Sequence, residues 1–226
     1  VSAFSQWGIE KTLNQLVGMF AIAVWNIKTK KLYLIRDRFG EKPLYYGWSN
    51  GIFLFGSELK ALRSYKGFNN EIDRSSLSLY MQYMYVPSPY SIFKDIYKLD
   101  PGCILEIDSI GAMQSPKQIT SFTFNSKGVG IKQWYSLSDI VKNSQNNLIT
   151  DENEAVELLE ETLLKSVQSQ LISDVPLGAF LSGGVDSSTI VALMSNECSH
   201  PVKTFTIGFE ESAFNEAVYA KDVAKH

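Results

Sequence analysis

Seven consecutive residues in the last quarter of the chain carry the clearest chemistry. They are Ser182, Gly183, Gly184, Val185, Asp186, Ser187 and Ser188. Glycines let a backbone approach a ligand closely, and serine hydroxyls donate hydrogen bonds to anions. Asp186 adds a carboxylate of the kind that holds Mg²⁺. These residue types in this order indicate a site for phosphate groups and a magnesium ion.

The residues on either side predict the elements that would position this loop. Residues 179–181 form a short apolar run typical of a buried strand, and residues 189–194 predict a helix. A helix that opens directly after a glycine-rich turn aims its first N–H groups, and the positive end of its dipole, at an anion. A second apolar strand is predicted over 203–209, so the two strands should be parallel with a right-handed connection.

Two common motifs do not fit the loop. A Walker A sequence needs Lys where this chain has Gly184, and a nucleophile elbow around Ser182 needs Gly where it has Phe180. The remaining pattern, Ser-Gly-Gly-x-Asp-Ser-Ser, resembles the pyrophosphate-binding loop of the ATP-pyrophosphatase family. That resemblance implies cleavage of ATP between its α and β phosphates. The alternative is a serine- and glycine-rich loop that binds no ligand.

Composition narrows the class of protein. The 226 residues are 45% hydrophobic, enough for one large or two ordinary domains, and carry a net charge of −3. Without a basic stripe, a nucleic-acid partner is not expected. No apolar run approaches the roughly 18 residues that span a bilayer. The two cysteines, Cys103 and Cys198, do not form a disulfide framework, which indicates a reducing cytoplasm.

The first half reads as strands and short helices. A helix is predicted over 1–16 with a break at Gly8, and the apolar run 18–25 predicts a strand buried on both faces. Further strands are expected at 31–35 and 103–107, a hairpin at 44–55 around Asn50-Gly51, a helix at 58–63, and a surface hairpin or loose loop at 109–130. The aromatic and Met-rich segment 80–85 predicts a core helix, with an interface lining as the alternative.

Three charges, Arg36, Asp37 and Arg38, directly follow a predicted buried strand and precede Gly40. Charges beside a buried strand must be paired or solvated. Their chemistry alone therefore favours a structural ion-pair corner with a glycine turn over a functional site.

The first half also carries a resemblance. The segments Gly18-Met-Phe-Ala, 36–46 and 57–62 resemble the later part of a class II glutamine amidotransferase domain. Such a domain followed by the Ser-Gly-Gly-x-Asp-Ser loop is the layout of the glutamine-hydrolysing asparagine synthetase family. The resemblance implies a partial α+β N-terminal-nucleophile-type sandwich over 1–135, a linker over 136–150, and a partial α/β parallel-sheet ATP-pyrophosphatase domain over 151–226.

The family's glutaminase nucleophile is a cysteine at position one of the mature chain, where this chain has Val1. The chain is therefore expected to be an internal fragment without a glutaminase catalytic residue. Cys103 follows the turn signature Asp100-Pro101-Gly102 and is expected to be a buried strand cysteine without an activating partner. The family's second nucleotide motif, Gly-Glu-Gly-x-Asp-Glu, is not found in the chain, which alone is expected to be inactive.

The resemblance also implies a binding mode, with Mg²⁺ beside Asp186 and adenine against Leu181 and Ile207. The residues expected to hold the pyrophosphate of ATP are Ser182, Gly183, Gly184, Asp186, Ser187 and Ser188. In this mechanism the β-carboxylate of aspartate attacks the α-phosphate and forms β-aspartyl-AMP. Ammonia from glutamine then displaces AMP and gives asparagine.

Three interpretations stay open at this point. The first is an asparagine synthetase acting on aspartate, glutamine and ATP in the cytoplasm, for which a homodimer is allowed. The second is a relative that activates another carboxylate, such as a β-lactam synthetase or an amidotransferase acting on a sugar acid or a peptide. The third is a non-catalytic fragment. The intact segment 36–46 favours the first.

Overall fold

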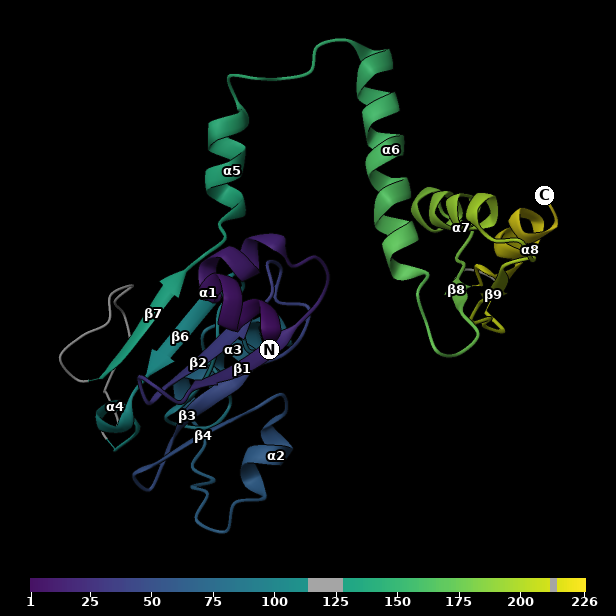
Figure 1. Ribbon diagram of the computed structural model, residues 1–226. Coiled ribbons are helices and arrows are strands. Elements are labelled where there is room, and N and C mark those ends of the chain that lie inside the picture. The colour runs from purple at the N-terminus through teal and green to yellow at the C-terminus, as the bar shows by residue number, and fades with distance from the viewer. Residues whose placement is uncertain (114–127, 212–214) are drawn as a thin grey trace. The chain divides into compact units, whose positions relative to one another are not determined.

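The computed structural model describes residues 1–113, 128–211 and 215–226 (Figure 1). The chain divides into two compact units, Val1–Asn143 and Ser144–His226. This division falls inside the segment 136–150 that was predicted to be a linker; the predicted domain boundaries themselves stay a prediction. Among the described helices, none combines the length and the apolar character that crossing a membrane requires.

The first unit contains two antiparallel sheets. The four-stranded sheet has the order β1-β2-β6-β7, and the three-stranded sheet has the order β4-β3-β5. Their bounds are β1 Ala21–Asn26, β2 Lys31–Arg36, β3 Tyr45–Ser49, β4 Ile52–Gly56, β5 Ile96–Lys98, β6 Cys103–Ile107 and β7 Val129–Gln133. The helices are α1 Ser2–Gln15, α2 Leu59–Arg63, α3 Arg74–Tyr83, α4 Ser109–Met113 and α5 Leu137–Ser144, the last ending one residue past the unit's boundary.

The two sheets share one hydrophobic core. Leu34 and Leu105 of the first sheet pack in one cluster with Tyr46 and Trp48 of the second. Because successive strand residues point to opposite faces, the neighbours Ile35 and Ile104 lie on the other face of the first sheet, where they pack with Leu13 of α1. The unit is thus a helix on a pair of sheets, which agrees with the expected mixed α+β class.

Local turn chemistry is as predicted. Asn50 and Gly51 have positive φ of 50° and 78°, and the hairpin pairs Ser49 with Ile52. Helix α1 is broken at Gly8, whose φ is 76° and ψ is 178°.

Three expectations differ from the structure, two about exposure and one about secondary structure. Strand β1 is not buried on both faces: Trp25 is 54% exposed on one face, whereas Val24 packs on the other face against the cluster of Leu13. The core-helix prediction for 80–85 is wrong: Met81 of α3 is 73% exposed, and Tyr80 and Tyr83 are exposed too. Within the predicted loop 109–130, the structure has α4 and the start of β7, and residues 114–127 lie outside the described part.

The charged corner at the end of β2 is bonded to backbone. Arg36 donates from Nε to the Lys42 carbonyl at 2.9 Å, and from Nη1 and Nη2 to the carbonyls of Leu99 and Gly40, both at 2.6 Å. The corner is structural, as its chemistry predicted, although its charges pair with peptide groups. Asp37 accepts from the N–H groups of Phe20, Phe39, Glu41 and Lys42 at 2.9–3.3 Å.

The corner leaves no room for a side chain at Gly40. A Cβ there would lie 2.8 Å from Cγ of Pro101 and 2.9 Å from Cζ of Arg36, and its φ is +68°. Glycine is required on both counts.

The second unit is built on a parallel pair of strands. Its elements are α6 Glu152–Gln170, β8 Gly178–Phe180, α7 Val185–Glu197, β9 Lys203–Phe205 and α8 Ala217–Lys225. Strands β8 and β9 are parallel, as the sequence predicted, but β9 ends at residue 205 and not 209. Asp151 caps α6 by accepting from the N–H of Glu154 at 2.8 Å. Val167 of α6 packs with Leu193 and Met194 of α7.

The first prediction concerns Asp37, which is 1% exposed. Asp37→Ala leaves four N–H groups without their acceptor, and we expect it to lower the free energy of unfolding by about 3 kcal/mol or more. Urea denaturation measures this change. The matched control is Asp139→Ala, at an exposed position of α5, expected to cost well under about 1 kcal/mol. Equal losses in the two variants would contradict the structural role of Asp37.

The same carboxylate predicts a pH dependence. Burial raises the pKa of Asp37, but its backbone hydrogen bonds outweigh this effect and hold the pKa below the ordinary value of 3.8. Because the folded pKa lies below the unfolded one, the stabilisation is present above about pH 4 and is lost as the pH falls further. Asp37→Ala should flatten the dependence of unfolding free energy on pH in that acidic range.

Candidate functional site

The Ser-Gly-Gly loop leaves the carboxyl end of β8 and opens α7. Leu181, the last residue before the loop, is 2% exposed, and its N–H donates to the Phe205 carbonyl at 2.9 Å. Gly184 is the N-cap of α7, and the Ser188 N–H donates to its carbonyl at 3.0 Å. The predicted succession of strand, glycine turn and helix is therefore present, but the strand is not buried as expected, because Phe180 is 80% exposed.

The first turn of α7 supplies the donors. The N–H groups of Val185, Asp186 and Ser187 come before the first helical hydrogen bond and have no acceptor within the helix. The helix dipole adds partial positive charge at this end. Asp186 lies in the same turn with an exposed side chain, so one carboxylate stands beside these donors.

Two hydroxyl groups close the loop on itself. Oγ of Ser182 lies 2.9 Å from Oγ of Ser187. The Ser187 hydroxyl also accepts from the Ser182 N–H at 3.2 Å and donates to the Gly184 carbonyl at 3.2 Å. The Ser182 hydroxyl accepts from the Gly184 N–H at 3.3 Å. These bonds hold the loop as a compact turn.

Ser188 differs from the other two serines. Its Oγ is buried and has no hydrogen-bond partner among the described residues. A buried hydroxyl without a partner is uncommon because its desolvation is not compensated. An orphaned hydroxyl beside a turn of N–H donors fits a site that accepts an oxyanion.

Helix α8 packs against the loop at Gly183. This glycine has a φ of +82°, and a Cβ on it would lie 2.7 Å from Cβ of Tyr219 and 2.8 Å from N of Ala220. Sequence reasoning missed this contact, because nothing in the spacing of 183 and 219 indicates that the two segments meet. It also missed Thr206, whose Oγ1 donates to the Leu181 carbonyl at 2.7 Å.

The predicted adenine residues differ in exposure. Leu181 is hydrogen-bonded to Phe205 and Thr206 at the end of β9. Ile207 is the next residue in the chain and therefore lies near the loop. The Ile207 side chain is 71% exposed, whereas that of Leu181 is buried. Their contact with adenine stays a prediction.

The metal prediction depends on one carboxylate. Within the part of the chain that the structure describes, no group of three or more His, Cys, Asp or Glu side chains is placed to hold an ion. Mg²⁺ is commonly held by one or two carboxylates together with substrate phosphates and water. Asp186 beside a phosphate-type turn fits that pattern.

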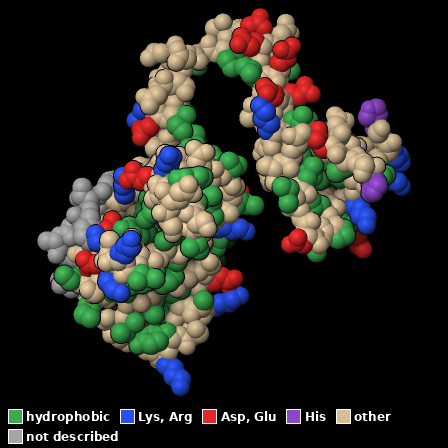
Figure 2. Space-filling view, in the orientation of Figure 1, with side chains coloured by type: hydrophobic (Ala, Val, Ile, Leu, Met, Phe, Trp, Pro, Cys, Tyr) green, Lys and Arg blue, Asp and Glu red, His purple; other side chains and the backbone are tan. Residues whose placement is uncertain are grey.

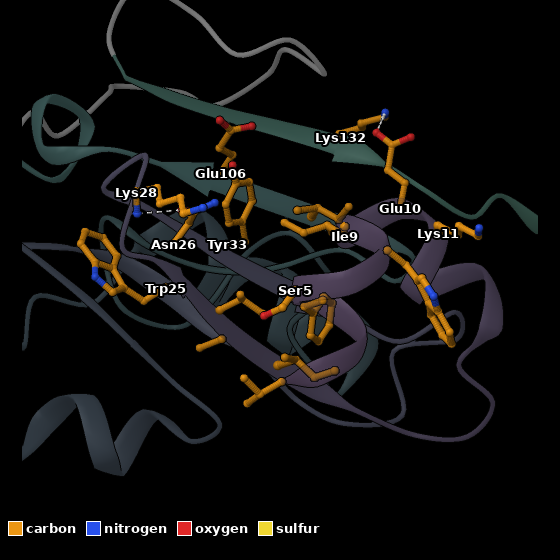
Figure 3. A pocket seen from close by; sticks show the side chains of 18 of the residues that line it. Ser5, Ile9, Glu10, Lys11, Trp25, Asn26, Lys28, Tyr33, Glu106 and Lys132 are labelled. Atoms are coloured by element: carbon orange, nitrogen blue, oxygen red, sulfur yellow. Dashed lines mark hydrogen bonds and ion pairs between the residues drawn. The ribbon is translucent and has the colours of Figure 1, made fainter.

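The first unit has a cavity of its own, whose mostly apolar lining differs from the glycine and serine residues of the loop. A groove of about 1230 Å³ lies between α1 and the outer face of the first sheet (Figure 3). Its lining is mostly apolar, with an ion pair of Glu10 and Lys132 at one side and Tyr33 beside Glu106 on the sheet. None of the predicted site residues lines it.

Cys103 is a buried strand residue, as predicted. It is the first residue of β6, and burial raises the pKa of its thiol to about 12. The thiol is therefore protonated near neutral pH and is not an activated nucleophile.

On the face drawn in Figure 2, the basic side chains of the first unit lie scattered among acidic and hydrophobic ones.

Comparison with protein families agrees with the two units. Residues 1–118 match the family described as glutamine amidotransferase domain, and residues 158–226 match the family described as asparagine synthase.

Individual relatives cover nearly the whole chain. The chain is 35% identical over 215 residues to asparagine synthetase [glutamine-hydrolyzing] 1 of Bacillus subtilis, an alignment that covers 95% of this chain and 30% of that protein. It is 32% identical to putative asparagine synthetase [glutamine-hydrolyzing] 2 of Methanocaldococcus jannaschii, covering 92% of this chain and 37% of that protein. A putative asparagine synthetase of Mycobacterium tuberculosis is 33% identical, covering 100% of this chain and 33% of that protein. The chain spans about a third of the length of these relatives.

The loop geometry predicts different effects for its two glycines. Gly183→Ala forces a side chain into a left-handed conformation and against α8, and we expect it to cost about 1–2 kcal/mol of unfolding free energy from the backbone alone. Gly184→Ala is the matched control, because its Cβ would meet only Oγ of Ser182 at 3.4 Å and its φ is −76°. Denaturation of both variants tests the packing, which would be wrong if Gly183→Ala were the milder change.

Proposed function

We propose that this chain, which belongs to the glutamine-hydrolysing asparagine synthetase family, is part of an enzyme that converts aspartate to asparagine with ATP and glutamine. The observation that carries the proposal is the Ser-Gly-Gly-Val-Asp-Ser-Ser loop, which leaves a parallel strand and opens α7. Ligands of α/β sheets bind at this end of the strands. The relatives' names, which specify glutamine hydrolysis, support the choice of nitrogen source.

In this proposal the loop holds the pyrophosphate part of ATP. The N–H groups at the start of α7 and the hydroxyl of Ser188 donate to phosphate oxygens. The hydroxyls of Ser182 and Ser187 would give up their bonds within the loop to do the same. Asp186 would hold Mg²⁺ against the same oxygens, and the ion would neutralise charge that develops on the leaving pyrophosphate. The contribution of the protein is electrostatic stabilisation by backbone N–H donors that are already in place.

The chemistry follows from the family. The β-carboxylate of aspartate attacks the α-phosphorus of ATP, the bond to the bridging oxygen breaks, and pyrophosphate leaves with the electron pair. The product β-aspartyl-AMP is an acyl phosphate, which water hydrolyses easily, so exclusion of water is needed. Ammonia attacks its carbonyl carbon, AMP leaves, and asparagine is formed.

The adenine is assigned to the surface beside the loop. The exposed Ile207 side chain offers an apolar contact, whereas Leu181 is buried with both of its backbone groups hydrogen-bonded, so its contact with the base stays a prediction. Glutamine hydrolysis is not assigned to Cys103, because burial keeps that thiol protonated.

The finer fold assignments belong to the same proposal. Two antiparallel sheets with a common core and α1 on the outer face support an N-terminal-nucleophile-type sandwich for residues 1–135. The parallel β8–β9 pair with α7 between them supports an ATP-pyrophosphatase domain for 151–226. A homodimer and a cytoplasmic location stay predictions.

The function is tested by pyrophosphate release from ATP, measured with the complete gene product, Mg²⁺, aspartate and ammonium. Release should require aspartate and yield asparagine and AMP in equal amounts. If the release required a different carboxylate, that compound and not aspartate would be the substrate. Pyrophosphate formed at the same rate without any carboxylate would refute amide synthesis.

The same assay tests Asp186. Asp186→Asn should lower kcat/KM for ATP on the order of 100-fold. The reason is that two unit charges about 4 Å apart near a protein surface attract each other by a few kcal/mol, and the variant loses this attraction between the carboxylate and Mg²⁺. Asp174→Asn, at an exposed position before β8, is the matched control and should keep the wild-type value. An active Asp186→Asn variant would remove this residue from the site.

A further inference from the structure

The peptide group between Leu181 and Ser182 is held from both ends by side-chain hydroxyls. Thr206 donates from Oγ1 to the Leu181 carbonyl at 2.7 Å. The N–H of Ser182, in the same peptide group, donates to Oγ of Ser187 at 3.2 Å. Because a peptide group is planar and its C=O and N–H point in opposite directions, the two bonds together define one orientation of this plane.

Thr206 takes the place of a backbone donor. Phe180 is paired with Phe205, and the Leu181 N–H donates to the Phe205 carbonyl, so a continued parallel ladder would bring the N–H of residue 207 to the Leu181 carbonyl. The Thr206 hydroxyl bonds to that carbonyl, and β9 ends at Phe205. The ladder therefore ends at the edge of the sheet where ligands of parallel sheets bind.

The orientation of this plane matters for an anion site. If the peptide turned over, its carbonyl oxygen would replace its N–H on the side of the loop, and a partial negative charge would face bound phosphate. Thr206 is itself exposed, but its acceptor belongs to Leu181, which is 2% exposed. Removing the donor leaves a carbonyl with little access to water, which weakens the resistance to this rotation.

We propose that Thr206 is a positioning residue of the phosphate site, and that its hydroxyl keeps the Leu181–Ser182 peptide in the orientation that binds ATP. This proposal rests on the proposed function, since it needs an ATP site at the loop. It adds a residue that lies outside the Ser-Gly-Gly-Val-Asp-Ser-Ser motif, on the neighbouring strand's extension.

The test is the ATP affinity of variants of the complete gene product, measured by isothermal titration with Mg²⁺-ATP. Thr206→Val keeps the shape and removes the donor, and it should raise the apparent Kd about 3- to 10-fold, the equivalent of one hydrogen bond. Thr206→Ser keeps the donor and should stay within about 2-fold of wild type. Thr204→Val, two residues earlier in β9, is the matched control and should bind as wild type.

A double-mutant cycle tests the shared plane. If Thr206 and Ser187 hold one peptide, releasing either end already frees it, so Thr206→Val and Ser187→Ala together should weaken binding by less than the product of their separate effects. Losses that multiply would show two independent contacts and would overturn the shared role.

The outcomes separate this inference from the proposed function. Wild-type affinity in Thr206→Val, or equal losses in Thr206→Ser and Thr206→Val, overturns the positioning role while Asp186-dependent ATP binding keeps the site. Equal losses in Thr206→Val and Thr204→Val, with equal falls in melting temperature, show a general effect on the strand and also overturn it. If the wild-type protein does not bind ATP, the proposed function fails, and this inference fails with it.

Discussion

Peptide groups that leave a sheet inside a protein must find new hydrogen-bond partners, and both units of this chain depend on side chains that supply them. In the first unit, Arg36 and Asp37 provide donors and acceptors where β2 ends. In the second, hydroxyl groups do so where β8 and β9 end. The charged corner has a structural purpose and the hydroxyl-lined turn is the candidate site, yet one physical requirement shapes both.

The corner joins segments that are distant in sequence. Arg36 reaches the carbonyl of Leu99 after β5, Asp37 reaches the N–H of Phe20 before β1, and Trp134 after β7 donates to the Arg36 carbonyl at 3.2 Å. The Arg38 guanidinium lies over the Trp134 ring at 5.1 Å and donates to the Leu16 carbonyl at the end of α1. Buried charges are tolerated here because nearly every bond they make is to a peptide group that also needs a partner.

Local patterns predicted local structure well. The Asn50-Gly51 turn, the break at Gly8 and the loop between β8 and α7 follow from residue types whose conformational demands are intrinsic. Exposure was harder, because an apolar run such as that of β1 shows that a face is hydrophobic and not what covers it. Thr206 and Tyr219 could not be assigned at all, since their contacts with the loop arise from the path of the chain and leave no mark in spacing.

The strand order has a consequence for synthesis on the ribosome. Strand β2 lies between β1, to which a short turn connects it, and β6. The side chains of Lys31 on β2 and Glu106 on β6 are paired although they are 75 residues apart in the chain. The β1–β2 hairpin therefore emerges long before its other neighbour, and Leu34 faces solvent until later strands supply Tyr46 and Leu105. An unpaired strand edge and an exposed apolar face are the features that make partly folded chains prone to aggregation.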